Sequence, residues 1–337
     1  MISDITIKNF KSVVDVSLPL GRFNLLIGAN GCGKSNILEG IAMGAAATSD
    51  KLDYEYFANR GIRIVTPIFM LPAFEGIDAD GVSVSFTNDH VVSLDICFDK
   101  TAKPARWVIK KKTGEPDIPS LGQFLIYSLE ESKLRQADNS NRTYPLGRHG
   151  EGLFAYLKEV AQRPESKQMF EEIKENLKVL DWFDDMEVPS GQLSMEFNLK
   201  LKDSYLADTL NSFDQRSTNE GFLYLLFYLT LVISDETPRF FAIENIDSAF
   251  NPKLCREVTR RLIDLARKHN KQIIATTHNA AVLDGMNLYE DDVRLHVVRR
   301  TIDGYTKTNR VTLKSDMTMP LSEAWQKGFI GGLPDNF

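Results

Sequence analysis

Apolar and polar residues alternate in several short runs near the start of the chain, and a spacing of two predicts β-strands. The runs lie at residues 5–8, 14–18, 82–86, 92–96 and 107–109, and residues 23–27 form one apolar run. Turn-forming residues such as Thr87, Asn88 and Asp89 separate the later runs, which is typical of a meander of strands. We therefore expect the chain to begin with a β-rich lobe.

Beyond residue 117 the spacing changes to that of helices. Four apolar residues after Pro164 recur at intervals of three and four, which predicts an amphipathic helix. They are Phe170, Ile173, Leu177 and Leu180. The apolar stretch 221–233 predicts a buried helix, and a further helix is expected to start at Pro252, with Asn251 as its cap.

Buried strands alternate with helices in the last third of the chain. Apolar runs at 239–243, 272–276 and 293–298 surround the helix from Pro252, and strand, helix, strand is the layout of a parallel α/β sheet. We expect a two-lobed α/β protein, in which a mainly helical subdomain is inserted and an apolar tail docks on its own lobe or on a partner. The expected divisions are an N-terminal lobe at 1–116, the insertion at 117–215, a C-terminal lobe at 216–310 and the tail at 311–337.

Composition narrows the classes of protein to which this chain can belong. It has 337 residues, of which 40 are basic and 46 acidic, so bulk charge gives no footprint of nucleic-acid binding and any DNA contact would be local. Its three cysteines are scattered, which suggests neither a disulfide framework nor a zinc site. No apolar run is long enough to span a bilayer and the N-terminus is unlike a signal peptide, so we expect a cytoplasmic protein without membrane contact.

Residues 28–35 read Gly-Ala-Asn-Gly-Cys-Gly-Lys-Ser and directly follow the apolar run 23–27. This is G-x-x-x-x-G-K-S, the pattern of a nucleotide-phosphate loop between a strand and a helix. Its glycines let backbone N–H groups surround an anion, Lys34 can reach the β- and γ-phosphates, and the Ser35 hydroxyl can ligate Mg²⁺. The sequence therefore predicts a site for a nucleoside phosphate and Mg²⁺.

Two further polar residues follow predicted buried strands. Glu244 comes directly after the run 240–243, and His278 follows the strand that ends near Thr276. Ligands of open α/β sheets bind at the carboxyl ends of the strands, so Glu244 is the candidate metal-holding acid and His278 the candidate partner of the γ-phosphate. Each alone is also consistent with a capping or surface residue.

Four segments in this order resemble the ABC-type ATPase heads of the RecF, SMC and OLD-like proteins. Ile5 to Ser12 is similar to the opening strand pair of that group, and Gly28 to Asn36 is similar to its G-x-N-G-x-G-K-S-N loop. Glu244 to Pro252 is similar to the group's Asp-Glu-Pro-Glu-x-x-Leu-His-Pro, and residues 276–279 are similar to its switch-histidine segment. The resemblance covers both lobes. The minimal architecture of the chain is also similar to that of compact ATPases of bacterial antiphage systems.

The resemblance implies ATP and Mg²⁺ as cofactors and an ATP-sandwiched dimer, or a higher even oligomer. The signature segment, which in such heads closes over nucleotide bound by the other subunit, would fall at Asn219, Glu220 and Gly221, although Asn219 replaces the usual serine. Asp247 would belong to the loop that crosses the dimer. Metal ligands would be Ser35 and Glu244. The nucleotide-binding residues would be Gly28, Asn30, Gly31, Gly33, Lys34, Ser35 and Asn36.

Asn245 is the main departure from the family's pattern. It occupies the position of the glutamate that polarises the attacking water, and a carboxamide is neither a base nor a negative charge. Loss of one such group typically costs about 10² to 10⁴ in rate, so we expect hydrolysis to be slow or absent. Asp247 could act on the water only if the loop were distorted.

The sequence-based hypothesis is therefore an ABC-type ATPase head that controls a separate effector, such as a nuclease, in a nucleic-acid-directed process of antiphage defence. The insertion of about 100 residues reaches at most roughly 75 Å as a folded-back helix pair, too short for a chromosome tether. We expect no effector domain in the chain itself. The alternatives are an active repair ATPase of the RecF type and a non-hydrolysing scaffold. The hypothesis of a transporter motor lacks support, because the sequence contains no Leu-Ser-Gly-Gly-Gln stretch. The hypothesis of a small-molecule kinase lacks support, because no segment resembles the arginine-rich lid that such a kinase usually has.

Overall fold

The computed structural model describes residues 1–114, 121–136, 145–188, 199–207, 212–313 and 319–333. The chain forms two compact units, each assembled from separate stretches. Unit 1 contains Met1–Ile126, Pro238–Ile246 and Gln272–Phe337, and unit 2 contains Tyr127–Thr237 and Asp247–Lys271. The expected boundary at 215 falls inside the stretch Tyr127–Thr237, and the one at 310 falls inside Gln272–Phe337. Two later segments, Pro238–Ile246 and Gln272–Phe337, return to unit 1 and supply strands to it.

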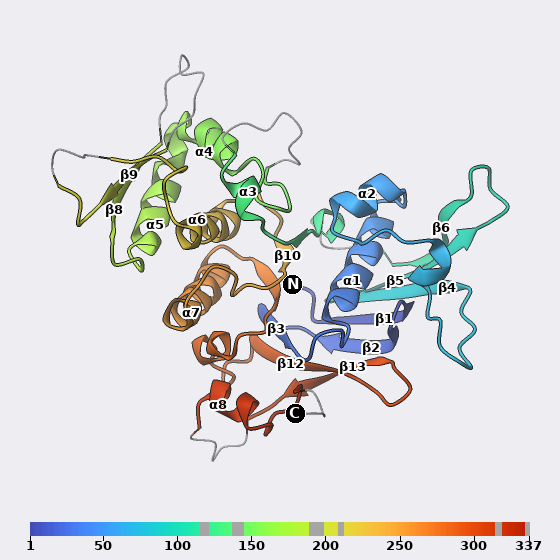
Figure 1. The fold of residues 1–337 in the computed structure, drawn as a ribbon. Helices are drawn as coiled ribbons and strands as arrows, with labels where there is room; N and C mark the ends of the chain where they lie inside the picture. The colour runs from blue at the N-terminus through green and yellow to red at the C-terminus, as the bar shows by residue number, and fades with distance from the viewer. Residues whose placement is uncertain (115–120, 137–144, 189–198, 208–211, 314–318, 334–337) are drawn as a thin grey trace. The chain divides into compact units, whose positions relative to one another are not determined.

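A six-stranded sheet forms the centre of unit 1, in the order β13-β12-β3-β11-β10-β7 (Figure 1). β3 runs parallel to both β11 and β12, β11 runs parallel to β10, and β13 is antiparallel to β12. Every residue of β3, β10 and β11 is buried, as expected for parallel strands that are covered on both faces. The strand bounds are β3 (Phe23–Ile27), β7 (Ile126–Tyr127), β10 (Phe240–Ile243), β11 (Gln272–Thr276), β12 (Val293–Arg300) and β13 (Thr306–Val311).

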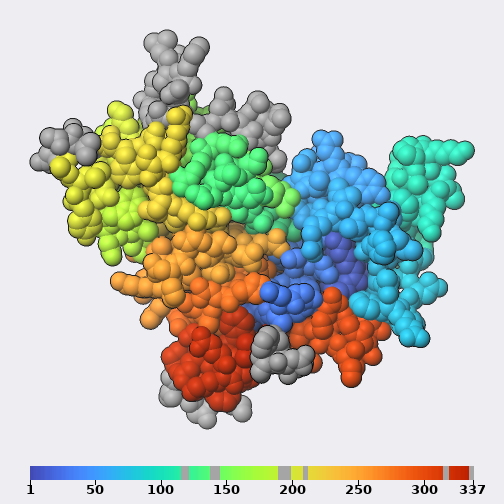
Figure 2. All heavy atoms as spheres, in the orientation of Figure 1, coloured from blue at the N-terminus to red at the C-terminus, as the bar shows by residue number. Residues whose placement is uncertain are grey.

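A second, antiparallel sheet confirms the predicted β-rich beginning of the chain. Its order is β2-β1-β4-β5-β6, and β4, β5 and β6 form the expected meander. The β5–β6 hairpin projects at the right of Figure 2 in teal. The bounds are β1 (Asp4–Phe10), β2 (Val13–Pro19), β4 (Gly81–Thr87), β5 (Val91–Asp99) and β6 (Arg106–Thr113).

Helix α1 (Lys34–Thr48) belongs to one core cluster with residues of both sheets. Its second half is built from small residues, and almost every position from Ile37 to Ala47 is buried. A Cβ at Gly44 would lie 2.5 Å from Val84 Cγ1, so only glycine permits this approach of the helix to β4. Packing therefore fixes α1, and with it the loop from which α1 begins. The shorter elements of unit 1 are α2 (Tyr54–Asn59), η1 (Pro67–Met70), η2 (Leu121–Gln123), η4 (Ala280–Gly285) and α8 (Leu321–Gln326).

Unit 2 is mainly helical, as expected, and also contains a two-stranded hairpin that the sequence did not predict. α6 is buried along nearly its whole length, and α7 begins as predicted, because the Asn251 side chain accepts a hydrogen bond from the Leu254 N–H at 3.0 Å. α5 ends at Leu177, so Leu180, which the sequence pattern assigned to this helix, lies beyond its end. The elements are α3 (Glu131–Leu134), α4 (Leu153–Ala161), η3 (Pro164–Ser166), α5 (Lys167–Leu177), β8 (Phe183–Glu187), β9 (Lys200–Asp203), α6 (Glu220–Ile233) and α7 (Pro252–Lys268).

The expected tail is described over residues 319–333. Leu321, Ala324 and Trp325 of α8 are buried, and α8 packs against η4 within unit 1. The tail thus docks on its own unit. Among the described residues, none of the helices combines the length and apolar character needed to cross a bilayer.

Candidate nucleotide site

The phosphate loop joins β3 to α1, as the motif predicts. Gly28, Gly31 and Gly33 have φ values of 151°, 74° and 109°, a region that side chains rarely adopt. A Cβ at Gly28 would lie 2.1 Å from the Val298 carbonyl oxygen, and one at Gly33 would lie 2.0 Å from Thr306 Oγ1. Two of the motif's glycines are therefore required both by backbone conformation and by the close approach of neighbouring strands.

The N-terminus of α1 is suited to an anion. Its cap residue is Gly33, which has no side chain to accept a hydrogen bond, and the first turn contains no acidic residue. The N–H groups that open the helix therefore lack a side-chain acceptor, and the helix dipole favours negative charge there. Phosphate groups fit this end of the helix, and Ser35 lies in its first turn.

Lys34 lies against the loop from which it emerges. Its Nζ donates hydrogen bonds to the carbonyl oxygens of Gly28 at 2.8 Å and Ala29 at 3.1 Å. Burial lowers the pKa of Lys34, while its interactions with Cys32 and with the more distant Glu244 act in the opposite direction. Glu244 is therefore close enough to Lys34 to influence its charge, as expected for a metal-holding acid beside a phosphate loop.

Glu244 and His278 follow strands whose carboxyl ends lie at one edge of the sheet. Leu26 of β3 is level with Thr276 of β11, and Ala275 of β11 is level with Ile243 of β10. β10, which ends just before Glu244, is not a direct neighbour of β3. β11 lies between them and brings the His278 segment between the phosphate loop and Glu244.

Asn245 sits in a turn that is fastened to β11. Its φ is 51°, in the left-handed region that Asn tolerates better than most residues. Its N–H donates to Thr276 Oγ1 at 3.0 Å, and the next N–H, of Ile246, donates to the Thr276 carbonyl oxygen at 3.0 Å. Asn245 and His278 are both exposed, so their side chains are accessible from solvent.

Asn36 is engaged by side chains that the motif did not predict. Its Nδ2 donates to Ser12 Oγ at 2.7 Å, and its Oδ1 accepts from Arg63 at 3.0 Å. Arg300 Nε donates to the carbonyl oxygen of Gly31 at 3.0 Å and so holds the tip of the phosphate loop. Asn30 is exposed at the same tip.

These side chains line a hollow of about 380 Å³ beside the first turn of α1. Arg300 contributes positive charge, Lys11 and Arg63 are both paired with the carboxylate of Glu39, and Phe69 and Phe74 contribute aromatic surface. The sequence offers little signal for this set, because its members come from distant segments and share no common motif.

The signature-like residues lie in unit 2. Asn219 caps α6 by accepting from the Phe222 N–H at 2.9 Å, and a Cβ at Gly221 would lie 3.2 Å from the Ala249 carbonyl oxygen. Asn219, Glu220 and Gly221 line a hollow of about 470 Å³ together with Lys253. The structure thus brings the signature-like segment next to the loop that follows Asp247.

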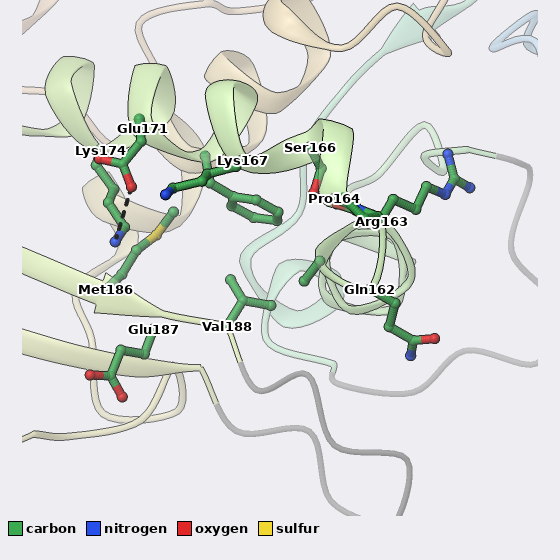
Figure 3. Close-up of a pocket in the computed structure, with 12 residues that line it drawn as sticks. Gln162, Arg163, Pro164, Ser166, Lys167, Glu171, Lys174, Met186, Glu187 and Val188 are labelled. Carbon is green, nitrogen blue, oxygen red and sulfur yellow. Dashed lines mark hydrogen bonds and ion pairs between the residues drawn. The ribbon is translucent and has the colours of Figure 1, made fainter.

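Figure 3 shows another hollow in unit 2, of about 580 Å³, between η3, α5 and β8. Phe170 and Met186 give it an apolar floor. Lys174 at its rim is paired with Asp185 at 2.9 Å and lies 4.0 Å from Glu171. None of the predicted site residues lines this hollow.

The fold and the loop together define a P-loop ATPase head of mixed α/β structure. Three solved structures are similar to it over nearly the whole of both chains. The SMC head domain from Thermotoga maritima is 14% identical (TM-score 0.53; 93% of this chain and 99% of that chain covered). An SmcHead bound to the C-winged helix domain of ScpA is 17% identical (0.62; 94% and 99%). An Smc head with an extended coiled coil, bound to the C-terminal domain of ScpA and derived from Pyrococcus furiosus, is 12% identical (0.58; 97% and 98%).

The family assignment comes from the sequence itself. Residues 1–219 match the family model described as the AAA ATPase domain, and the chain belongs to that family. None of the curated proteins matches the chain. The solved heads support the predicted ABC-type ATPase fold, and the family match supports nucleotide binding.

Proposed function

We propose that the chain binds ATP with Mg²⁺ at the loop between β3 and α1. Lys34 would hold the β- and γ-phosphates, Ser35 and Glu244 would hold the metal, and His278 would hydrogen-bond the γ-phosphate. The observation that carries the proposal is the uncapped N-terminus of α1, with a buried lysine over the loop and Glu244 within electrostatic reach. When bound, Mg²⁺ would neutralise phosphate charge.

We further propose that ATP holds two copies of the chain together. The support is the family resemblance of the segment at Asn219, Glu220 and Gly221, and its position beside an open hollow next to the loop after Asp247. In this arrangement the signature-like segment of one copy closes over nucleotide bound by the other.

Hydrolysis in this proposal is slow, because the carboxamide of Asn245 cannot accept a proton from the attacking water. The exposed side chain of Asn245 stands one residue after Glu244, where a base would act. A long-lived ATP-bound dimer follows from intact binding and impaired turnover. The non-hydrolysing scaffold is the limiting case of the same proposal, and the rate of phosphate release distinguishes the two.

We propose that the dimer controls a separate effector, such as a nuclease acting on nucleic acid, in antiphage defence. This step rests on the resemblance to compact ATPases of such systems, which is an analogy at the level of architecture. Copurification with the products of adjacent genes, with and without ATP, tests it. An effector that is retained only with ATP supports the proposal, and the absence of any retained protein in both conditions contradicts it.

Dimerisation is tested by light scattering after gel filtration, with and without Mg²⁺ and ATP. We expect the mass to double with ATP. It should remain that of one chain for Lys34→Ala, which binds nucleotide more weakly, at an ATP concentration that saturates only the wild-type chain. Lys253→Glu, which reverses an exposed charge beside the signature-like segment, should bind ATP and remain monomeric. Lys111→Glu, an exposed charge on β6, is the matched control and should dimerise. A wild-type chain that binds ATP without a change of mass would refute the dimer.

A further inference from the structure

The C-terminal helix is attached to the turn that follows the switch-histidine segment. Both carboxylate oxygens of Asp284 in η4 accept hydrogen bonds from Ser322, one from its N–H at 3.0 Å and one from its hydroxyl at 2.7 Å. The residue before α8 is Pro320, whose side chain provides no cap. Asp284 therefore supplies the cap of α8 from another segment, and Figure 1 shows α8 in red.

η4 is in turn connected to His278 by two local caps. Thr277 Oγ1 accepts from the N–H of Asn279 at 2.9 Å, and Asn279 Oδ1 accepts from the N–H of Ala281 at 3.0 Å. The backbone on both sides of His278 is thus tied to the start of η4. Any displacement of η4 would be transmitted to the position of the exposed His278 side chain.

Beyond α8 the chain returns to the start of the phosphate loop. Gly328, Gly331 and Gly332 all have positive φ, from 77° to 86°, a backbone conformation that glycine adopts without strain. A Cβ on Gly332 would lie 3.0 Å from Val297 Cγ1 and 3.6 Å from the Cα of Gly28. The backbone at Gly332 therefore packs directly against the first glycine of the loop.

We propose that residues 320–333 act as a strap that holds the His278 turn and the phosphate loop in register. Asp284 and Ser322 are then positioning residues, which act through His278 and touch no nucleotide themselves. This inference rests on the proposed function, in which His278 contacts the γ-phosphate. Since only ATP carries that phosphate, the Asp284–Ser322 hydrogen bonds at the η4 end of the strap govern the preference for ATP over ADP, whereas ADP reaches the phosphate loop but not His278.

The test compares the Kd values of ATP and ADP, with Mg²⁺, for the wild-type chain and for Ser322→Ala. We expect the affinity for ATP to fall about 5-fold or more, as is typical of coupled sites, while the affinity for ADP stays within about 2-fold. Ser322→Thr keeps the hydroxyl and should restore the preference. Ser83→Ala, which breaks another serine–aspartate hydrogen bond in unit 1, of 2.6 Å to Asp95, is the matched control and should behave as wild type.

Hydrogen exchange gives a second readout. In the wild-type chain ATP should slow exchange over residues 277–285 more than ADP does, and Ser322→Ala should abolish that difference. The inference is overturned if Ser322→Ala weakens ATP and ADP equally, or if it changes neither affinity nor exchange. A wild-type chain that binds neither nucleotide would overturn the proposed function itself, and is thereby distinguished from failure of the strap alone.

Discussion

Replacing Asn245 by glutamate should make the protein a faster ATPase and a less stable one. The substitution places a carboxylate one residue after Glu244, at the position to which the proposed function assigns the catalytic base, and such a group contributes about 10² to 10⁴ in rate. The backbone conformation at this position, in contrast, makes the glutamate variant less stable. At a φ of 51°, asparagine is tolerated better than glutamate, so the free energy of unfolding should fall by about 1 kcal/mol.

The assay is phosphate release at saturating ATP, measured beside thermal unfolding without nucleotide. Asn245→Gln is the matched control, because glutamine has the length of glutamate and the same backbone strain but no charge. We expect both variants to unfold at a similarly lowered temperature and only Asn245→Glu to gain rate. If wild-type protein already turns over ATP at tens per second, or if Asn245→Glu gains no rate although it binds ATP normally, the assignment of this position is wrong.

Three further predictions concern the loop and its surroundings. Because burial lowers the pKa of Lys34, this lysine loses its charge at a lower pH than a free lysine does. The affinity of the wild-type chain for ATP should therefore fall with rising pH, while the affinity of Lys34→Arg persists. Parallel curves of affinity against pH for the two proteins would contradict this. Gly33→Ala, whose Cβ would meet Thr306 Oγ1 at 2.0 Å, should weaken ATP binding more than Gly31→Ala, whose Cβ meets nothing within 4 Å; equal losses in calorimetry would argue against a role for close packing. Glu39→Ala should lower the free energy of unfolding by about 3 kcal/mol, because it removes the buried carboxylate that pairs with half-buried Lys11 and with Arg63. Glu39→Leu combined with Lys11→Met should recover most of that loss in urea titrations.

The features that the sequence predicted well are those encoded locally. The strand, glycine loop and helix around Lys34 follow from neighbouring residues, as does the start of α7 at Asn251 and Pro252. The β4–β6 meander follows from alternation along each strand. In each case the residues that determine the structure lie within one turn or one strand of it.

The features that it missed depend on contacts between distant segments. β8 reads Phe-Asp-Asp-Met-Glu, which alternates poorly, and it is stabilised by pairing with β9 across a long connection. The position of β11 between β3 and β10 is a matter of strand order, which local patterns do not encode. Arg300, at the end of β12, donates a hydrogen bond to the Gly31 carbonyl oxygen, and no spacing in the sequence predicts that contact.

The central claim is that the loop between β3 and α1 grips ATP. Isothermal titration of the intact chain with ATP and Mg²⁺ tests it most directly. We predict saturable binding of one nucleotide per chain, weakened about 10- to 100-fold by Lys34→Ala through loss of charged hydrogen bonds. No heat of binding with folded wild-type protein, or unchanged binding by Lys34→Ala, would contradict the account.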